Sequence, residues 1–337
     1  MRQINIHGVD DVRMDEAPVP SPGPRDVVVK ITACGICGTD LGFARSGGMG
    51  RISPMPLGHE AAGVITQVGA EVKGARAGQR VVINPMSTEA VIGNGGPEGA
   101  FADMLLVREA ELGRSLFEIP AGMPDTVAAL VEPLSVARHA VNRGAPKPGE
   151  KVVVFGAGPI GLGAVVWLKR RGVERLVVVD LNAGRLERAR ALGATDVVVA
   201  GQGDLAAQLT EICGAAAVLG GPAVDVDLYI DAAGAPQIMG QVVAMSKLHS
   251  RLVVVAVHHG PVSLDLSRML RSELSITTSI GYPTELPEVL ADLRELGREA
   301  EILTSHRFPF DRFFDAFEVA RGGDCAKVMV EFEGGSA

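Results

Sequence analysis

A glycine-rich turn between an apolar strand and a helix constrains the fold of this chain more than any other feature. The turn has the pattern G-x-G-x-x-G and consists of Gly156, Ala157, Gly158, Pro159, Ile160 and Gly161. It follows the apolar run Val152–Phe155, and the helical pattern after it extends to about Arg171. A strand, a glycine turn and a helix in this order are typical of a dinucleotide-binding βαβ unit.

Each residue of the turn has a physical role in such a unit. Gly156 permits the tight turn, Gly158 lets the backbone approach a pyrophosphate, and Gly161 allows the helix to pack closely against the strand. Pro159 and Ile160 begin the helix, whose free N–H groups and positive dipole end face the phosphates. A glycine turn that binds a flavin or S-adenosylmethionine is the alternative interpretation.

A carboxylate at the end of the second apolar strand indicates which dinucleotide binds. Asp180 lies 19 residues after Gly161. There it accepts hydrogen bonds from the adenosine ribose hydroxyls and repels a 2′-phosphate, which favours NAD over NADP. Arg185 lies one helical turn further along the chain. It would weaken the preference for NAD if its side chain faces the cofactor. Alternatively, it is a solvent-exposed charge on the helix.

Beyond residue 150, apolar strands alternate with helical segments. The predicted strands are Lys151–Phe155, Leu176–Val179, Asp196–Val199, Val226–Ile230, Leu252–Val257 and Ser275–Ser279. Near-continuous apolar strands separated by helices indicate a parallel sheet that is covered on both faces. We therefore predict an α/β fold with a doubly wound, six-stranded Rossmann sheet.

The first part of the chain has a different texture. Short β-branched runs separated by Gly and Pro predict a mostly β, barrel-like domain over residues 1–140, with a surface loop at 87–99. A Gly- and Pro-rich break at 143–149 lies near the start of the predicted nucleotide domain, 141–281. Residues 282–337 mix helices with a final strand and are predicted to return to the first domain.

Composition and termini exclude several classes of function. The net charge is −8, and no block of five like charges occurs, so neither a nucleic acid nor a membrane is an expected partner. The N-terminus lacks the apolar region of a secretory signal. Four cysteines in 337 residues do not make a disulfide framework, which favours a reduced, cytoplasmic setting.

A few polar residues in the first part stand out as candidates for a metal site. Cys34 and Cys37 form a C-x-x-C, but no second pair exists that would complete a zinc ribbon. His59 and Glu60 lie between short runs, and Glu132 interrupts an apolar stretch. A buried carboxylate needs a cation, a hydrogen-bond partner or a raised pKa. Taken singly, each is compatible with a structural role: a small hydrophobic Cys, a core or surface His, an ion-paired Glu.

Taken together, these segments resemble the zinc-dependent medium-chain dehydrogenases, and among them the sorbitol, threonine and butanediol dehydrogenase branch. The resemblance extends over nearly the whole chain, and it implies a GroES-like barrel for the first domain. It rests on the glycine turn with Asp180 and on the segments Cys34–Asp40, Leu57–Glu60, Gly78–Val81 and Val131–Ala137.

The resemblance implies roles for individual residues. Cys37, His59 and Glu132 occupy zinc-ligand positions, Glu60 neighbours the metal or replaces its water, and Asp40 holds the His59 ring. A thiolate and one carboxylate cancel the charge of Zn²⁺, and three protein ligands leave the fourth position open for substrate. Coordination by Glu60 would make the site anionic, so we expect it only in a resting or exchanging state.

The sequence departs from the family pattern in two places. Residues 84–101 contain no cysteine where many members have a four-cysteine lobe, so we predict one catalytic zinc and no structural zinc. Gly42 stands where the family commonly has a histidine of the proton relay. Thr39 can still accept the first proton, but the further exit has to use water or an unidentified group.

The implied activity is NAD-linked interconversion of a secondary alcohol or polyol and its ketone. Ala233, Val257 and Ile280 lie at the ends of predicted parallel strands and are candidates to contact the nicotinamide half. Ordinary strand-end turns are the alternative interpretation. A metal-free quinone or enoyl reductase and a non-catalytic dinucleotide-binding protein are the rival interpretations. The resemblance also implies a homodimer or homotetramer.

Overall fold

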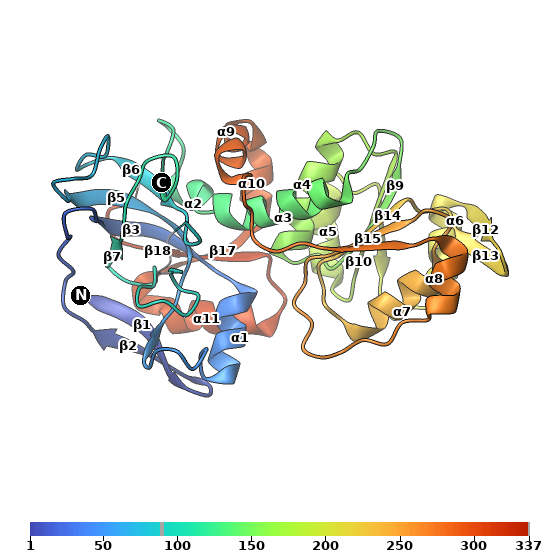
Figure 1. Ribbon diagram of the computed structural model, residues 1–337, viewed down its shortest axis with the longest axis horizontal. Coiled ribbons are helices and arrows are strands. Elements are labelled where there is room, and N and C mark those ends of the chain that lie inside the picture. The colour runs from blue at the N-terminus through green and yellow to red at the C-terminus, as the bar shows by residue number, and fades with distance from the viewer. Residues whose placement is uncertain (88–90, 336–337) are drawn as a thin grey trace. The chain divides into compact units, whose positions relative to one another are not determined.

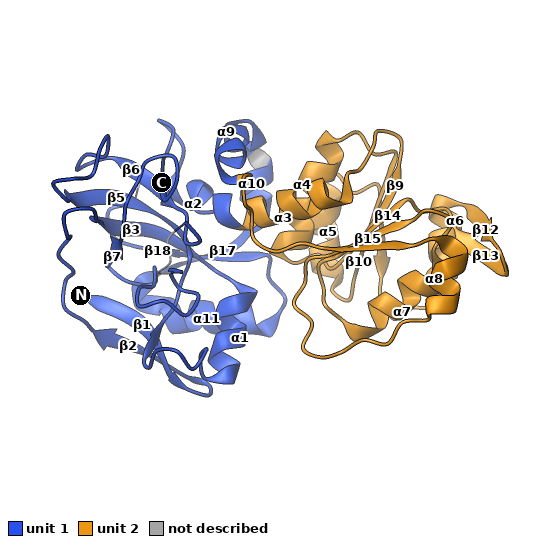
Figure 2. Ribbon diagram, in the orientation of Figure 1, with its two compact units in different colours: residues 1–132, 286–337 blue, residues 133–285 orange. Residues whose placement is uncertain are grey.

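The computed structural model describes residues 1–87 and 91–335, without the side chain of Arg298 (Figure 1). The chain divides into two compact units, Met1–Glu132 with Leu286–Ala337 and Pro133–Glu285 (Figure 2). The chain thus leaves the first unit once and returns to it near the C-terminus. Among the described residues, no helix is both long and apolar enough to cross a membrane.

The first unit is built mainly from β-strands. Its strands are β1 (Arg2–Gly8), β2 (Asp11–Glu16), β3 (Val27–Ile36), β4 (Met55–Pro56), β5 (Glu60–Val68), β6 (Arg80–Ile83), β7 (Met104–Val107), β8 (Leu116–Glu118), β17 (Thr304–Pro309) and β18 (Lys327–Glu331). Its helices are α1 (Gly38–Ser46), α2 (Asp125–Ala128), α9 (Leu286–Leu296), α10 (Arg298–Leu303), the 3-10 turn η1 (Phe310–Arg312) and α11 (Phe313–Gly322).

One long strand organises this unit. β3 pairs with β5, β7 and β18, all antiparallel, in a sheet of order β17-β18-β3-β5-β6-β8. Nearly every residue of β3 is buried, which explains why its sequence is mostly apolar. Side chains of α11 complete the core, and Phe101 contacts Phe313 edge-to-face with ring centroids 4.9 Å apart.

The second unit contains the predicted parallel sheet. Its strands are β9 (Lys151–Phe155), β10 (Arg175–Asp180), β11 (Asp196–Val199), β12 (Ala215–Val218), β13 (Gly221–Val224), β14 (Leu228–Asp231), β15 (Arg251–Val254) and β16 (Ser275–Thr278). Its helices are α3 (Val131–Gly144, which begins in the first unit), α4 (Pro159–Arg170), α5 (Ala183–Leu192), α6 (Leu205–Cys213), α7 (Pro236–Met245) and α8 (Leu266–Ser272).

The sheet has the strand order β11-β10-β9-β14-β15-β16 and is parallel throughout. The prediction of a doubly wound, six-stranded α/β sheet is therefore confirmed. Val153 and Phe155 face the side on which α6 and α7 pack, contributing Leu209 and Val242 to the same core. The antiparallel hairpin β12–β13 is an addition that the sequence patterns did not indicate.

Two expectations about chain organisation need correction. The first division falls before Pro133, not at residue 140, because α3 packs on α4: the Trp167 indole N–H donates to the Leu134 carbonyl at 2.9 Å. The second division falls after Glu285, not at 281.

The prediction of a surface loop at 87–99 also needs correction. Over 91–99 this segment is largely buried, with Ile92 2% exposed. Its residues 88–90 lie outside the described residues.

Candidate active site

The C-x-x-C segment carries its second cysteine off the end of β3. Cys37 directly follows the strand and precedes α1, and its backbone N–H donates to Asp40 Oδ2 at 2.8 Å. The carboxylate satisfies one of the N–H groups that have no partner within a helix at its first turn. The sequence Cys-Gly-Thr-Asp thus folds back on itself and fixes the position of the thiol.

A second tight segment brings His59 and Glu60 to the same place. Gly58 has a φ of +94°, and a Cβ there would lie 2.5 Å from the backbone nitrogen of Phe101, so the position requires glycine. The Gly58 N–H also donates to Asp40 Oδ1 at 3.3 Å. Asp40 therefore joins the two segments from a fully buried position.

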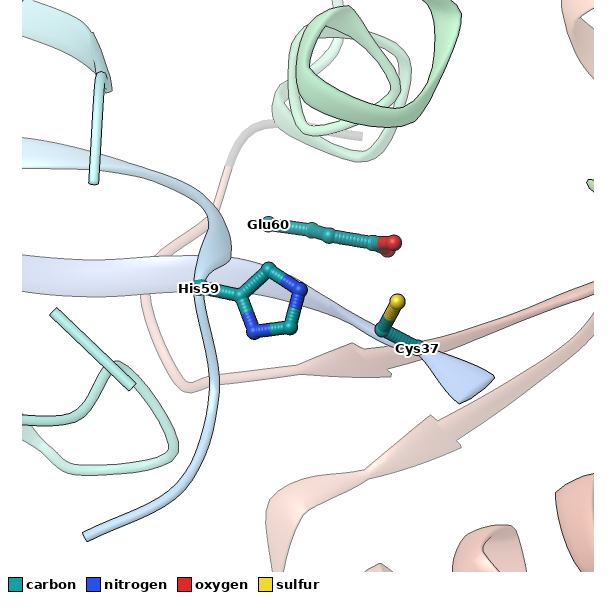
Figure 3. A group of neighbouring side chains, drawn as sticks. All are labelled: Cys37, His59 and Glu60. Atoms are coloured by element: carbon teal, nitrogen blue, oxygen red, sulfur yellow. The ribbon is translucent and has the colours of Figure 1, made fainter. Parts of the chain in front are cut away.

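The register of the sheet completes the convergence. β3 and β5 are antiparallel, and Gly35 lies opposite Glu60. As a result, donor atoms of Cys37, His59 and Glu60 all lie within 4.8 Å of one another (Figure 3). A thiol sulfur, an imidazole nitrogen and a carboxylate oxygen are the donor types that zinc takes in proteins, so this cluster fits a zinc ion.

Charges around His59 influence its protonation. Its ring is 4% exposed, and Nδ1 lies 3.5 Å from Asp40 Oδ1, longer than a good hydrogen bond. Burial opposes a charge on the ring, but Asp40 and Cys37 outweigh it, so the pKa of His59 is raised well above its usual value. Metal coordination by this ring therefore requires the loss of a proton.

A buried lysine, which the sequence analysis did not consider, is paired with Glu60. Lys327 Nζ lies 2.6 Å from Oε1 and 2.5 Å from Oε2 of Glu60 and donates to the Ile36 carbonyl at 2.9 Å. Burial opposes its charge, but Glu60 outweighs this, with help from Cys37 and Glu132, and the pKa of Lys327 is raised. The sequence signal was a lysine directly before the apolar run Val328–Val330.

Gly35 of the C-x-x-C segment makes room for this pair. A Cβ at Gly35 would lie 2.1 Å from Glu60 Oε2 and 3.0 Å from Lys327 Cδ. Because real side chains do not approach so closely, a larger residue at position 35 would displace the Glu60 carboxylate from its place beside Lys327.

The structure does not bring every candidate ligand into the three-residue cluster. Glu132, the second residue of α3, is 6% exposed and close enough to contribute to the raised pKa of Lys327, but it is not one of the three clustered donors. Thr39 is half-buried in the first turn of α1, and Gly42 lies one turn further along that helix.

The glycine turn of the second unit has the geometry that a dinucleotide needs. Gly156 has a φ of +94°, and a Cβ at Gly161 would lie 1.8 Å from the Gly156 carbonyl oxygen. A Cβ at Gly158 would meet nothing within 4 Å, so this glycine faces open space. Gly158 is the N-cap of α4 and Pro159 begins the helix, which leaves backbone N–H groups for an anion.

Asp180 has a structural task that the sequence analysis did not predict. Its Oδ2 accepts the Ala157 N–H at 2.6 Å, and its Oδ1 accepts the Asn182 N–H at 2.7 Å. Each carboxylate oxygen retains a second lone pair that can accept from a ribose hydroxyl. Arg185 is partly exposed in α5, and its backbone N–H donates to Asn182 Oδ1 at 2.9 Å.

The three strand-end candidates lie beyond the carboxyl ends of β14, β15 and β16. Ala233 is exposed, and Val257 and Ile280 are 73% and 89% exposed. Exposed apolar side chains at this edge of a parallel sheet are suited to contact a ligand there.

Comparisons with known proteins agree with this geometry. The family model described as alcohol dehydrogenase GroES-like domain matches residues 23–120, and the one described as zinc-binding dehydrogenase matches residues 159–295. The chain belongs to the zinc-dependent medium-chain dehydrogenases, in the branch that includes sorbitol and butanediol dehydrogenases.

Particular relatives are similar over almost the whole chain. Sorbitol dehydrogenase of Rattus norvegicus is 31% identical over 345 residues, covering 97% of this chain and 94% of that protein. Among solved structures, 2R,3R-butanediol dehydrogenase from Bacillus subtilis has a TM-score of 0.86 and 27% identity, covering 98% of this chain and 99% of that one.

Two further solved structures contain nicotinamide cofactors. An alcohol dehydrogenase from E. coli CFT073 holds NADH and has a TM-score of 0.86 and 28% identity, covering 98% of this chain and 99% of that one. A zinc-binding dehydrogenase from Sinorhizobium meliloti 1021 holds NADP, with a TM-score of 0.85, 26% identity and 98% of both chains covered.

Proposed function

We propose that this protein is an NAD-linked, zinc-dependent dehydrogenase that oxidises a secondary alcohol or polyol, such as a sugar alcohol or a vicinal diol, to its ketone. The convergence of Cys37, His59 and Glu60 in a buried cluster is the observation that carries this proposal. The substrate class follows from the sorbitol and butanediol dehydrogenases that the chain resembles.

We infer that Cys37, His59 and Glu132 would hold the zinc and that Glu60, paired with Lys327, would stay beside it. When bound, zinc would supply Lewis-acid chemistry that lowers the pKa of the alcohol, and a nicotinamide cofactor would supply the hydride acceptor. Thr39 Oγ1 accepts the hydrogen bond of the alcohol hydroxyl and passes its proton toward solvent. Asp40 keeps the two ligand segments in place.

Cofactor choice is assigned to Asp180. A carboxylate fixed at the end of β10 by two backbone N–H groups offers its remaining lone pairs to the ribose hydroxyls and repels a 2′-phosphate. The glycine turn and the N-terminus of α4 bind the pyrophosphate. Exposed Ala233, Val257 and Ile280 are proposed to receive the nicotinamide half.

The proposal includes one zinc per subunit and self-association. Among residues 1–87 and 91–335 the structure has one cluster of three metal-ligand donors, which supports one zinc per subunit. Self-association as a homodimer or homotetramer is expected for this branch. All four cysteines are free, which supports a reducing compartment such as the cytoplasm.

Metal analysis combined with a substrate panel tests the proposal. Purified protein is analysed for zinc by mass spectrometry and assayed with NAD or NADP on sorbitol, butane-2,3-diol and related polyols. One zinc per subunit with NAD-dependent turnover is the expected result. Absence of metal, with no gain when zinc is added back, would favour a metal-free reductase. Bound zinc and NAD without turnover of any alcohol would favour a non-catalytic protein.

The cofactor assignment has its own test. In Asp180→Asn the charge is lost while the size is kept, so the preference for NAD over NADP in kcat/KM is expected to fall about tenfold or more, or about 1.4 kcal/mol. Urea denaturation of the same variant measures the structural task of the carboxylate separately. An unchanged cofactor ratio would show that another residue contacts the ribose.

A further inference from the structure

A half-buried histidine and a buried aspartate form a pair at the carboxyl edge of the parallel sheet. Asp231 is the last residue of β14 and is fully buried, and its Oδ2 lies 2.8 Å from His258 Nε2. Its Oδ1 accepts the backbone N–H groups of Ala233 and Gly234 at 3.0 and 2.9 Å. The carboxylate is therefore held by its own loop and in turn holds the imidazole.

The other nitrogen of the His258 ring has no partner. Nδ1 is buried, and no atom of the described residues makes a hydrogen bond with it. A carboxylate can only accept, so Nε2 carries the proton of the neutral ring and Nδ1 is left as an acceptor. Because a buried polar atom without a partner costs free energy, this nitrogen indicates a ligand that donates a hydrogen bond.

The order of strands shows which part of a dinucleotide reaches His258. β9, which leads into the glycine turn, lies between β10 and β14. With the adenosine over Asp180 at the end of β10, the second nucleoside extends to the other side, over β14 and β15. A Cβ at Gly156 would lie 3.0 Å from Ala232 and 3.1 Å from Ala233 Cβ, so the loop after β14 adjoins the turn.

Two kinds of surface are available beyond β15 and β16. Val257 and Ile280 are exposed apolar side chains, which suit the face of a nicotinamide ring. His258 offers a polar acceptor that is fixed in orientation, which suits a sugar hydroxyl. The ribose also comes before the ring along the cofactor, next to the pyrophosphate that the turn binds.

We propose that His258 Nδ1 accepts a hydrogen bond from a hydroxyl of the nicotinamide ribose, with Asp231 fixing the tautomer and orientation of the ring. This inference rests on the proposed use of a nicotinamide cofactor. It makes His258 a cofactor-contacting residue and Asp231 a positioning residue, and it gives the protein a ribose contact in the loop after β15.

Ligand fragments locate the contact without an activity assay. The variant His258→Phe keeps an aromatic ring but removes both nitrogens, and His259→Phe alters the exposed neighbour as a control. Affinities for NADH, ADP-ribose and ADP are measured by calorimetry on the full-length protein. Because one hydrogen bond is lost, His258→Phe is expected to bind NADH and ADP-ribose about five- to tenfold more weakly. The affinity for ADP, which lacks the second ribose, stays unchanged.

Each other outcome overturns the proposal in a recognisable way. Unchanged affinity for all three ligands removes His258 from the site, and equal losses including ADP make it structural. A loss confined to NADH assigns the contact to the nicotinamide ring instead of the ribose. If His258→Phe does not fold, His258→Ala gives the same comparison. Failure of the unaltered protein to bind NADH contradicts the proposed function instead.

Discussion

The pairing of Glu60 with Lys327 changes the charge balance of the metal cluster. Lys327 places one buried positive charge directly beside the Glu60 carboxylate. A cation bound by the cluster would therefore share the negative charge of Glu60 with the lysine. The ion pair also gives the Glu60 carboxylate a partner that does not depend on metal.

Removing the lysine alone is expected to be costly. In Lys327→Met, Glu60 is left buried without its cation, and the free energy of unfolding is expected to fall by about 3–5 kcal/mol. Urea denaturation of metal-free protein measures this loss. The double variant Lys327→Met/Glu60→Gln carries no unpaired charge and should recover much of it. A single variant as stable as the unaltered protein would contradict a structural role for the pair.

Glu60 and Glu132 can be told apart as zinc ligands. In Glu132→Gln, zinc affinity is expected to fall by at least the roughly 10- to 100-fold typical of changes to outer partners of a metal site. Glu60→Gln is the matched variant and should retain most of the zinc. Competition with a chelator followed by metal analysis gives both affinities. The reverse pattern would make Glu60 the third ligand.

Sequence reasoning reached most of the site but not its steric and electrostatic support. Cys37, His59 and Glu60 were identified through motif resemblance, and the structure brings them together. Lys327 was missed because it lies far from Glu60 along the chain, and only strand pairing between β18 and β3 reveals the contact. The reason for Gly35 likewise appears only when the neighbours of its missing Cβ are known.

At the scale of elements, two glycines of the same turn have different tasks. Gly161 is required by packing, because a Cβ there would overlap the Gly156 carbonyl, whereas Gly158 faces open space. Packing can therefore be separated from binding within six residues.

The two alanine variants are expected to differ in what they lose. Gly161→Ala should lower the free energy of unfolding by about 1–3 kcal/mol through overpacking. Gly158→Ala should leave the Tm of the cofactor-free protein unchanged. Its affinity for NADH should fall about tenfold or more, equivalent to about 1.4 kcal/mol of binding free energy. Thermal denaturation and NADH titration of both variants provide the comparison. If both variants lowered the free energy of unfolding equally, Gly158 would have a packing role like that of Gly161 and not a separate role in binding.

The sequence patterns predicted the strands of the parallel sheet better than the hairpin β12–β13 and the segment 91–99. The apolar runs at 151–155 and 196–199 match β9 and β11 because buried parallel strands are continuous in hydrophobicity. The hairpin β12–β13 was missed because its Ala, Gly and Pro residues carry no alternating pattern. The segment 91–99 reads as an exposed loop from its Gly and Asn content, yet Glu98 is 8% exposed and pairs with Arg108.

At the scale of the whole molecule, each unit has a hydrophobic core of its own. One core includes β3, β5 and α11, and the other includes the parallel sheet with α6 and α7. The clustered metal donors belong to the first unit and the glycine turn to the second. The Gly- and Pro-rich break suggested a later boundary, since sequence alone does not show that α3 packs on α4.

Removal of the metal is therefore expected to act locally. A ligand present at 100 times its Kd stabilises the state that binds it by roughly 2.7 kcal/mol. Chelation of zinc should increase amide hydrogen exchange in residues 36–60 and leave β9, β10 and α4 unchanged. NADH should protect residues 156–161. Mass spectrometry of exchanged peptides measures both, and a uniform change over both units after chelation would contradict this division.

The narrow space beside Gly35 also restricts how this protein can evolve. A larger residue at position 35 would displace the Glu60 carboxylate, and loss of either Glu60 or Lys327 would leave the other as an unpaired buried charge. A change at any one of positions 35, 60 and 327 is therefore expected to destabilise the protein unless the other two change with it. Under selection, these three positions are expected to change together and not one at a time.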